Sequence, residues 1–223
     1  MPPLPVLLLP GLDGTGDLFA PLVAAAPPEV RPIVVRLPET GSYDEIFDAI
    51  REQIPNERFA VIGESFSGPL ALRVAREAGD RVVAVILCNS VLVPPITPLL
   101  RFVPWTLLFA VRPPRWVIRR FFVGRDAPPE LVSAVQRAIA KTPRRILAAR
   151  MRAVFTLPKS PPHVDAPVLC LRGTEDRMVA QKLPFARKEI AGPHLLLQAR
   201  PVEAWNAITA LLSDSRPASS PAE

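Results

Sequence analysis

Histidine and cysteine, which carry much of enzyme and metal chemistry, are scarce: this 223-residue chain has two of each. The sequence contains no Cys-x-x-Cys pair, which argues against a redox motif and against a structural zinc site. Cys88 and Cys170 each lie within a short apolar run typical of a β-strand. We therefore expect two buried free thiols, no metal and no cofactor, with a disulfide as the alternative only if the two strands are neighbours.

Long apolar runs are also missing. A membrane-spanning helix needs about 18 uninterrupted apolar residues, whereas the longest candidate, residues 102–111, has ten and contains Pro104. The apolar start of the chain carries no basic leader, so we expect no signal peptide and a cytoplasmic location. Residues 213–223 are rich in Ser, Ala and Pro, and we expect them to form a disordered tail.

Proline and positive charge are abundant, and both are unevenly distributed. Of the 29 prolines, 12 lie between Pro94 and Pro162. Residues 94–160 contain 13 Lys or Arg and only two acids, whereas the rest of the chain has 14 basic and 19 acidic residues. We interpret residues 94–160 (below, the insertion) as a basic, apolar segment set into a core formed by residues 1–93 and 161–212.

Five short apolar runs lack polar alternation, which is typical of strands buried on both faces of a parallel sheet. They span residues 5–9, 32–37, 59–63, 82–88 and 167–171. Helical patterns separate them, at residues 42–54 with a capping-box spacing, at 68–79 and from Pro201 onward. This alternation predicts an α/β fold, with a mostly parallel sheet flanked by helices.

The stretch VIGESFSG (residues 61–68) joins a strand pattern to a helical one, which is the context of a nucleophile elbow. The serine backbone in such a turn is strained, so the residues two before and two after it must be small. Gly63 and Ser67 meet this condition for Ser65, whereas Pro69 would crowd a turn centred on Ser67. Ser65 is therefore favoured as the nucleophile, and Ser67 is interpreted as a small helix-packing residue. A Gly/Ser turn without chemistry remains the alternative.

A serine nucleophile needs a general base, and the chain offers two histidines. His194 follows the last expected strand and precedes the final helix, which is where a catalytic base is needed. His163 lies in a proline-rich approach to a strand and is interpreted as an exposed loop residue. His194 is therefore favoured as the base.

The acid that orients the base is expected after one of the later strands. No acid follows the strand ending at Cys88 until Asp126, so that position is empty. The strand ending at Leu171 is followed by Glu175 and Asp176, of which Asp176 is favoured because it lies three residues past a turn glycine. Only 17 residues separate Asp176 from His194, so any helix between them is expected to be a single turn.

The loop LPGLDGTG (residues 9–16) follows the first expected strand and offers backbone donors for an oxyanion. Gly11 and Gly14 would let the backbone approach the site closely, as Gly63 would at the elbow. The N–H groups of Leu12 and Phe66 are the candidate donors. The glycines run G-x-x-G-x-G rather than G-x-G-x-x-G, which argues against dinucleotide binding.

The motifs LPGLDGTG, GESFSG and GPHLLLQARP together resemble small bacterial serine hydrolases of the α/β-hydrolase superfamily, over residues 4–212. The resemblance implies a triad of Ser65, Asp176 and His194, in the chain order of that superfamily. It also implies that the insertion is a helical cap, or lid, placed after the sixth strand of the family. The family's first hairpin is expected to be absent.

These observations predict a serine hydrolase that cleaves carboxylic esters through an acyl-enzyme. The same triad would serve a thioesterase, an acyltransferase or a perhydrolase, and a non-catalytic binding protein of the same fold is the alternative from another class. Trp105 and Phe109 of the insertion are candidate pocket residues for an apolar acyl chain. The favoured interpretation of the insertion's apolar residues and arginines is a lid core with solvated arginines. Contact of the arginines with an anionic carrier or a membrane surface is the alternative, whereas a nucleic-acid partner is not expected.

Overall fold

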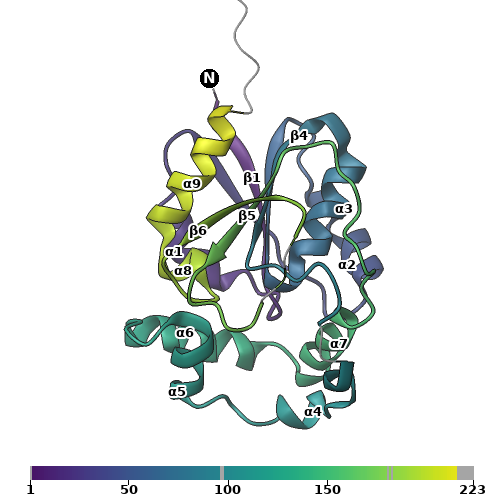
Figure 1. The fold of residues 1–223 in the computed structure, drawn as a ribbon, viewed down its shortest axis with the longest axis vertical. Helices are drawn as coiled ribbons and strands as arrows, with labels where there is room; N and C mark the ends of the chain where they lie inside the picture. Colours follow the sequence, from purple (N-terminus) through teal and green to yellow (C-terminus); the bar gives the residue numbers. More distant parts are fainter. Residues whose placement is uncertain (1, 96–97, 180, 182, 215–223) are drawn as a thin grey trace, which may run out of the picture.

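Six strands form a single parallel sheet in the computed structural model, which describes residues 2–95, 98–179, 181 and 183–214. The strand order is β2-β1-β3-β4-β5-β6, and all five pairings among the described strands are parallel. Figure 1 shows the sheet at the centre of the molecule. The strands are β1 (Leu4–Leu9), β2 (Val30–Val34), β3 (Phe59–Glu64), β4 (Val82–Cys88), β5 (Val168–Gly173) and β6 (Ala186–Ile190).

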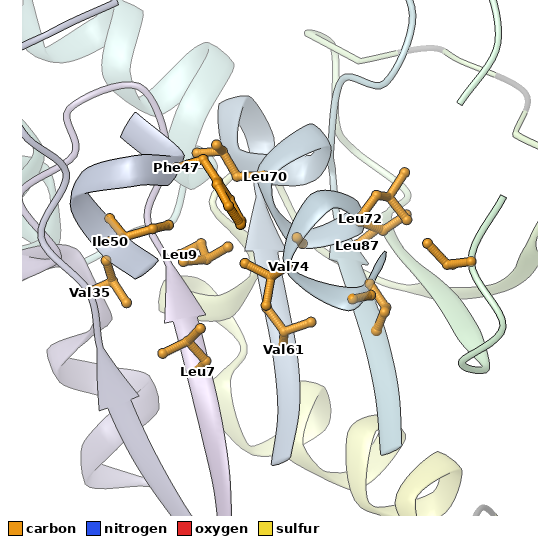
Figure 2. Close-up of a cluster of buried hydrophobic side chains, with 14 of the residues drawn as sticks. Leu7, Leu9, Val35, Phe47, Ile50, Val61, Leu70, Leu72, Val74 and Leu87 are labelled. Carbon is orange, nitrogen blue, oxygen red and sulfur yellow. The ribbon is translucent and has the colours of Figure 1, made fainter. Parts of the chain in front are cut away.

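Two helical layers cover the sheet. One face packs against α2 (Tyr43–Ile50) and α3 (Gly68–Ala78), and the other against α1 (Ala20–Ala24), α8 (Leu196–Ala199) and α9 (Pro201–Asp214). Side chains alternate along β1, since Leu7 and Leu9 face the first layer whereas Val6 and Leu8 face the second. Figure 2 shows the first of these clusters, to which the sheet contributes Leu7 and Val61 and the helices contribute Phe47 and Leu70.

The described sheet confirms the expected α/β fold and all five expected strands, with shifts at their ends. The second strand begins at Val30 rather than Pro32. Pro32 lacks an N–H, but β2 is an edge strand, where proline is tolerated. The expected helix over residues 42–54 consists of α2 followed by the 3₁₀ turn η2 (Arg51–Gln53). Half of the expected capping box forms: the Ser42 hydroxyl accepts from the Glu45 N–H at 3.4 Å, whereas the Ser42 N–H donates to the Thr40 hydroxyl instead of to Glu45.

The insertion follows β4 and contains several short helices that gather at one end of the molecule (Figure 1). Its elements are η5 (Pro98–Phe102), α4 (Trp105–Leu108), α5 (Arg115–Ile118), the π-helical turn η6 (Arg119–Val123), α6 (Pro129–Lys141) and α7 (Arg144–Val154). Ile118, Val132 and Val135 are buried with Leu18 and Leu195 of the core, so the insertion shares a small apolar cluster with it.

Three expectations concern the rest of the chain. Ser213 and Asp214 belong to α9, so the expectation that the tail begins at 213 is wrong for these two residues, and 215–223 lie outside the described residues. The described residues between β5 and β6 contain no helix. Cys88 and Cys170 are buried free thiols on neighbouring strands, and they face opposite sides of the sheet.

Candidate active site

Ser65 follows β3 directly, at a sharp turn into α3 through the 3₁₀ turn η3 (Ser65–Ser67). Its φ is +50°, a left-handed conformation that a non-glycine residue adopts at a cost of about 1–3 kcal/mol. A Cβ at Gly63 would lie 2.7 Å from the Ser67 carbonyl oxygen and 2.8 Å from the Ala71 side chain. Only glycine fits at position 63, so the turn holds Ser65 partly exposed above the sheet.

Ser65, His194 and Asp176 form a continuous hydrogen-bonded chain. The Ser65 Oγ lies 3.0 Å from His194 Nε2, and His194 Nδ1 lies 3.1 Å from Asp176 Oδ1. The three residues come from the ends of β3, β5 and β6, which parallel pairing brings to one edge of the sheet. The histidine is 3% and the aspartate 8% exposed, so water is excluded from the bond that orients the imidazole.

Asp176 is oriented by the turn that contains it. Its Oδ1 also accepts hydrogen bonds from the N–H groups of Met178 and Val179, at 2.8 and 3.3 Å. The neighbouring acid, Glu175, is exposed. The second histidine, His163, is also exposed and lies 3.4 Å from Asp165 in the loop before β5. Of the two candidate acids and the two candidate histidines, therefore, only Asp176 and His194 belong to the hydrogen-bonded chain that ends at the serine.

Asn89, at the end of β4, fixes the loop that carries His194. Its side-chain amide donates to the carbonyls of Pro193 and His194, at 3.1 and 2.6 Å, and its Oδ1 accepts from the Gly173 N–H at 2.9 Å. The residue is buried, with φ of +44°. The sequence analysis looked for an acid directly after β4 and found none. The amide of Asn89 occupies that position and joins β4, β5 and the loop that carries His194.

The loop after β1 lies beside the serine because β1 and β3 are neighbours at the switch point of the sheet. A Cβ at Gly11 would lie 3.7 Å from the Ser65 Cβ. In the described part of the chain, no group accepts a hydrogen bond from the N–H of Leu12 or from that of Phe66. The Ser67 hydroxyl donates to the Pro10 carbonyl, so Ser67 ties this loop to the elbow in addition to packing.

Arg150 of α7, which sequence reasoning missed, also holds this loop. It is 1% exposed, and its guanidinium donates to the carbonyls of Leu12, Pro38 and Thr40 at 2.9, 2.7 and 3.1 Å. Desolvation lowers its pKa to about 10. Gly14, expected to face the site, faces this guanidinium instead, since a Cβ there would lie 2.2 Å from Arg150 Nη1.

Two aromatic contacts complete the surroundings of the triad. The ring of Tyr43 stacks on that of Phe66 with centroids 4.7 Å apart, and its hydroxyl donates to the Phe66 carbonyl at 3.0 Å. From the insertion, the Phe122 ring meets the His194 ring edge-on at 6.2 Å, and its carbonyl accepts from the Leu195 N–H. Both contacts hold residues next to the serine or the histidine in place.

Glu64, directly before Ser65, is a buried acid. Gln198 donates to its Oε2 at 3.1 Å, whereas its Oε1 meets no partner among the described residues. Burial raises the pKa of Glu64 to about 8, and the neighbouring charge of Asp13 adds to this effect. The carboxyl group is therefore predominantly neutral at pH 7.

The expected pocket residues, Trp105 and Phe109, stack on each other in the insertion with centroids 6.1 Å apart. Trp105 also stacks on Phe155 at 6.4 Å. Both are partly exposed, and their role as pocket residues stays a prediction. No group of three or more His, Cys, Asp or Glu within the described residues could hold a metal ion.

Comparisons with solved structures support this architecture. An enol-lactonase of Burkholderia xenovorans LB400 superposes with a TM-score of 0.73 at 18% identity, covering 95% of this chain and 92% of its own. A thermophilic esterase of Thermogutta terrifontis gives 0.71 at 21% identity, covering 96% and 91%. A bromoperoxidase of Bacillus anthracis gives 0.74 at 17% identity, covering 95% and 92%. At these identities the likeness concerns the fold alone.

Sequence comparison identifies the family. The phytyl ester synthase 1 of Arabidopsis thaliana, a chloroplast protein, is 31% identical over 121 residues, which cover 48% of this chain and 17% of the relative. This chain thus matches only a small part of that protein's length. The family model described as the alpha/beta hydrolase family matches residues 6–208. The chain therefore belongs to the alpha/beta hydrolase family.

Proposed function

We propose that this hydrolase cleaves carboxylic esters through an acyl-enzyme formed on Ser65. The observation that carries the proposal is the chain of two hydrogen bonds, of 3.0 and 3.1 Å, from Ser65 through His194 to Asp176. His194 Nε2 would take the hydroxyl proton as Ser65 Oγ attacks the ester carbonyl, and would then return it to the leaving alcohol. Asp176 would stabilise the imidazolium that forms in between. Water, activated by the same histidine, would release the acid.

The oxyanion of each tetrahedral intermediate would be held by the N–H groups of Leu12 and Phe66. Both lie on segments in contact with Ser65, and both lack an acceptor among the described groups. Such fixed donors are worth about 10²- to 10³-fold in kcat per donor. We also propose that the insertion, residues 94–160, is the cap of this site, because Phe122 and Arg150 reach the residues around Ser65.

Labelling with a fluorophosphonate probe tests the nucleophile directly. We expect the wild type to be labelled, and we expect Ser65→Ala to lose labelling and at least about 10³-fold in kcat on a p-nitrophenyl ester. Ser67→Ala is the matched control, because it removes a hydroxyl two residues away and should retain labelling. Full activity in Ser65→Ala would refute the proposal, and an unlabelled wild type would favour a non-catalytic binding protein.

Acyl transfer is a second candidate, favoured by the similarity to a phytyl ester synthase. In that reaction an alcohol, rather than water, would attack the acyl-Ser65 intermediate. Incubating the enzyme with an activated ester and a long-chain alcohol would distinguish the two. Formation of the new ester in excess over free acid would support acyl transfer, whereas free acid alone would support hydrolysis. A thioester series would test thioesterase activity in the same assay.

A further inference from the structure

Large apolar side chains are exposed along one short part of the insertion. Eight of the twelve exposed large hydrophobic residues in the described part of the chain lie between residues 99 and 121. We call these eight the apolar face: Leu99, Leu100, Phe102, Leu107, Leu108, Val111, Trp116 and Phe121. Leu99, Phe102, Val111 and Trp116 are each at least 67% exposed. A large exposed apolar surface marks interaction sites in soluble proteins.

The charged side chains in the segment that carries the apolar face are all positive. Residues 99–121 contain five arginines and no acid, and none of these arginines forms an ion pair with a described carboxylate. Two of them lie over exposed rings, Arg101 over Phe102 at 4.6 Å and Arg120 over Phe121 at 5.4 Å. Aromatic groups interleaved with arginines suit an interface that has an apolar interior and an anionic surface.

The apolar face lies at the outer end of the molecule, yet it is joined closely to the site. Helices α4 and α5 lie at the end opposite the N-terminus (Figure 1). The π-helical turn η6 exposes Phe121, and its next residue, Phe122, meets the His194 ring at 6.2 Å. One peptide unit therefore separates the exposed surface from the residue that contacts the histidine.

We propose that the apolar face docks on an anionic lipid surface and there presents Ser65 to esters dissolved in the lipid. The assignment of a lipid ester as substrate rests on the proposed function, whereas the docking does not. No helix among the described residues is long and apolar enough to cross a membrane, so the contact would be interfacial. Each arginine near an anionic bilayer contributes about 1 kcal/mol to binding, and the exposed rings add apolar burial.

A second copy of the chain is a poorer partner for this face. Two-fold self-association would bring the same surfaces together, and the five arginines of one copy would then face those of the other. Like charges opposed in this way disfavour association. An anionic lipid surface instead satisfies both the charge and the apolar side chains.

Vesicle flotation tests the docking without turnover if the Ser65→Ala protein is used. We expect at least about fivefold more protein on phosphatidylcholine vesicles containing phosphatidylglycerol than on phosphatidylcholine alone, and a marked decrease in 1 M salt. The triple variant Phe102→Ser, Leu107→Ser, Trp116→Ser should lose binding to anionic vesicles, and Arg101→Gln with Arg112→Gln should weaken it. Val202→Ser with Arg51→Gln is the matched control, because both residues are exposed outside the insertion.

Activity separates this inference from the proposed function. In the Ser65-containing enzyme, the triple variant should keep its turnover of a soluble p-nitrophenyl ester and lose at least about fivefold on a long-chain ester in anionic vesicles. Docking is overturned if the wild type does not bind anionic vesicles, or if the variants bind them as well as the control does. It is also overturned if the apolar face instead mediates a concentration-dependent dimer. An enzyme that binds vesicles but cleaves no ester would leave docking intact and refute the proposed function.

Discussion

The carboxyl group of Glu64 is fully buried one residue before Ser65, and its charged form is disfavoured there. Its pKa is about 8 in the folded protein, against an ordinary value of 4.5. Between these values the folded chain holds a proton that the unfolded chain releases, so the free energy of unfolding falls as pH rises through this window. Because Glu64 Oε2 would lie 3.8 Å from a Cβ at Gly11, ionisation would also place a negative charge near the proposed oxyanion.

Glu64→Gln removes the titration and preserves the shape of the side chain. Between about pH 5 and about pH 9, we expect the Tm of this variant to fall less than that of the wild type. At the upper end of this range, its free energy of unfolding should exceed that of the wild type by a few kcal/mol. Thermal denaturation across this range measures the difference. Glu77→Gln, an exposed acid on α3, is the control and should follow the wild type. Parallel profiles for Glu64→Gln and the wild type would contradict the prediction.

Individual residues of the candidate site were predictable where few alternatives existed. Two histidines and a single acid-bearing turn after the fifth expected strand left few ways to combine Ser65, Asp176 and His194, and the structure brings these three together. Arg150 and Tyr43 were not predictable in this way. Their partners are backbone carbonyls distant in sequence, which leave no spacing motif, although Arg150 does continue the apolar i, i+4 stripe of Ile146 and Val154.

At the scale of elements, the ends of β4 and β5 and the loop after β6 are held together by the side chain of Asn89. Asn89→Ala would leave two carbonyls and one N–H without their partner, and would place alanine at a φ of +44°. We expect a loss of about 2–4 kcal/mol in the free energy of unfolding and a decrease in kcat, because the His194 loop loses its support. Chemical denaturation and steady-state kinetics measure the two effects.

Asn89→Gly separates the hydrogen bonds from the backbone conformation. Glycine tolerates positive φ, so this variant should lose the same three hydrogen bonds with less strain. If the amide is what positions His194, both variants should show a similar decrease in kcat, and glycine should be the more stable. A kcat that recovers fully in Asn89→Gly would contradict a positioning role for the side chain.

Elements were predictable from the sequence where burial dictated their composition. β4, buried along almost its whole length, has the limits that its apolar run predicts. β6 was not identified as a separate run, because four of its five residues are exposed and its sequence, ARKEI, is charged. β6 is an edge strand whose side chains are mostly exposed, so burial imposes no continuous apolar run on its sequence.

At the scale of the whole molecule, the sheet order explains why the site forms where it does. The chain begins at β1, adds β2 on one side, and then returns to build β3 to β6 on the other. The loop after β1 and the serine turn after β3 meet at this reversal, where ligands bind in open α/β sheets. Composition alone identified the insertion as a separate segment, but not how it attaches to the core. Besides the shared apolar cluster, its attachment uses a buried cation with carbonyl partners, for which charge counting gives no signal.

Arg150 provides the buried polar part of this attachment, so its removal tests how the insertion and the core depend on each other. Arg150→Met preserves much of the buried volume and removes the donors to three carbonyls, including that of Leu12. We expect a loss of about 3 kcal/mol in the free energy of unfolding. We also expect kcat to fall more than KM rises, because the loop that carries the Leu12 N–H loses its support.

Two further variants decide between loss of charge and loss of geometry at this position. Arg150→Lys keeps a cation, but a single ammonium cannot reproduce the planar, forked donors of a guanidinium, so it should restore only part of the stability and of kcat. Arg144→Met, at the exposed first turn of α7, removes the same side chain from the same helix and should change neither. Affinity for a boronic acid, which forms a tetrahedral adduct with a reactive serine, should fall in parallel with kcat in Arg150→Met. Unchanged affinity in a destabilised Arg150→Met protein would mean that Arg150 fastens the insertion without positioning the Leu12 amide.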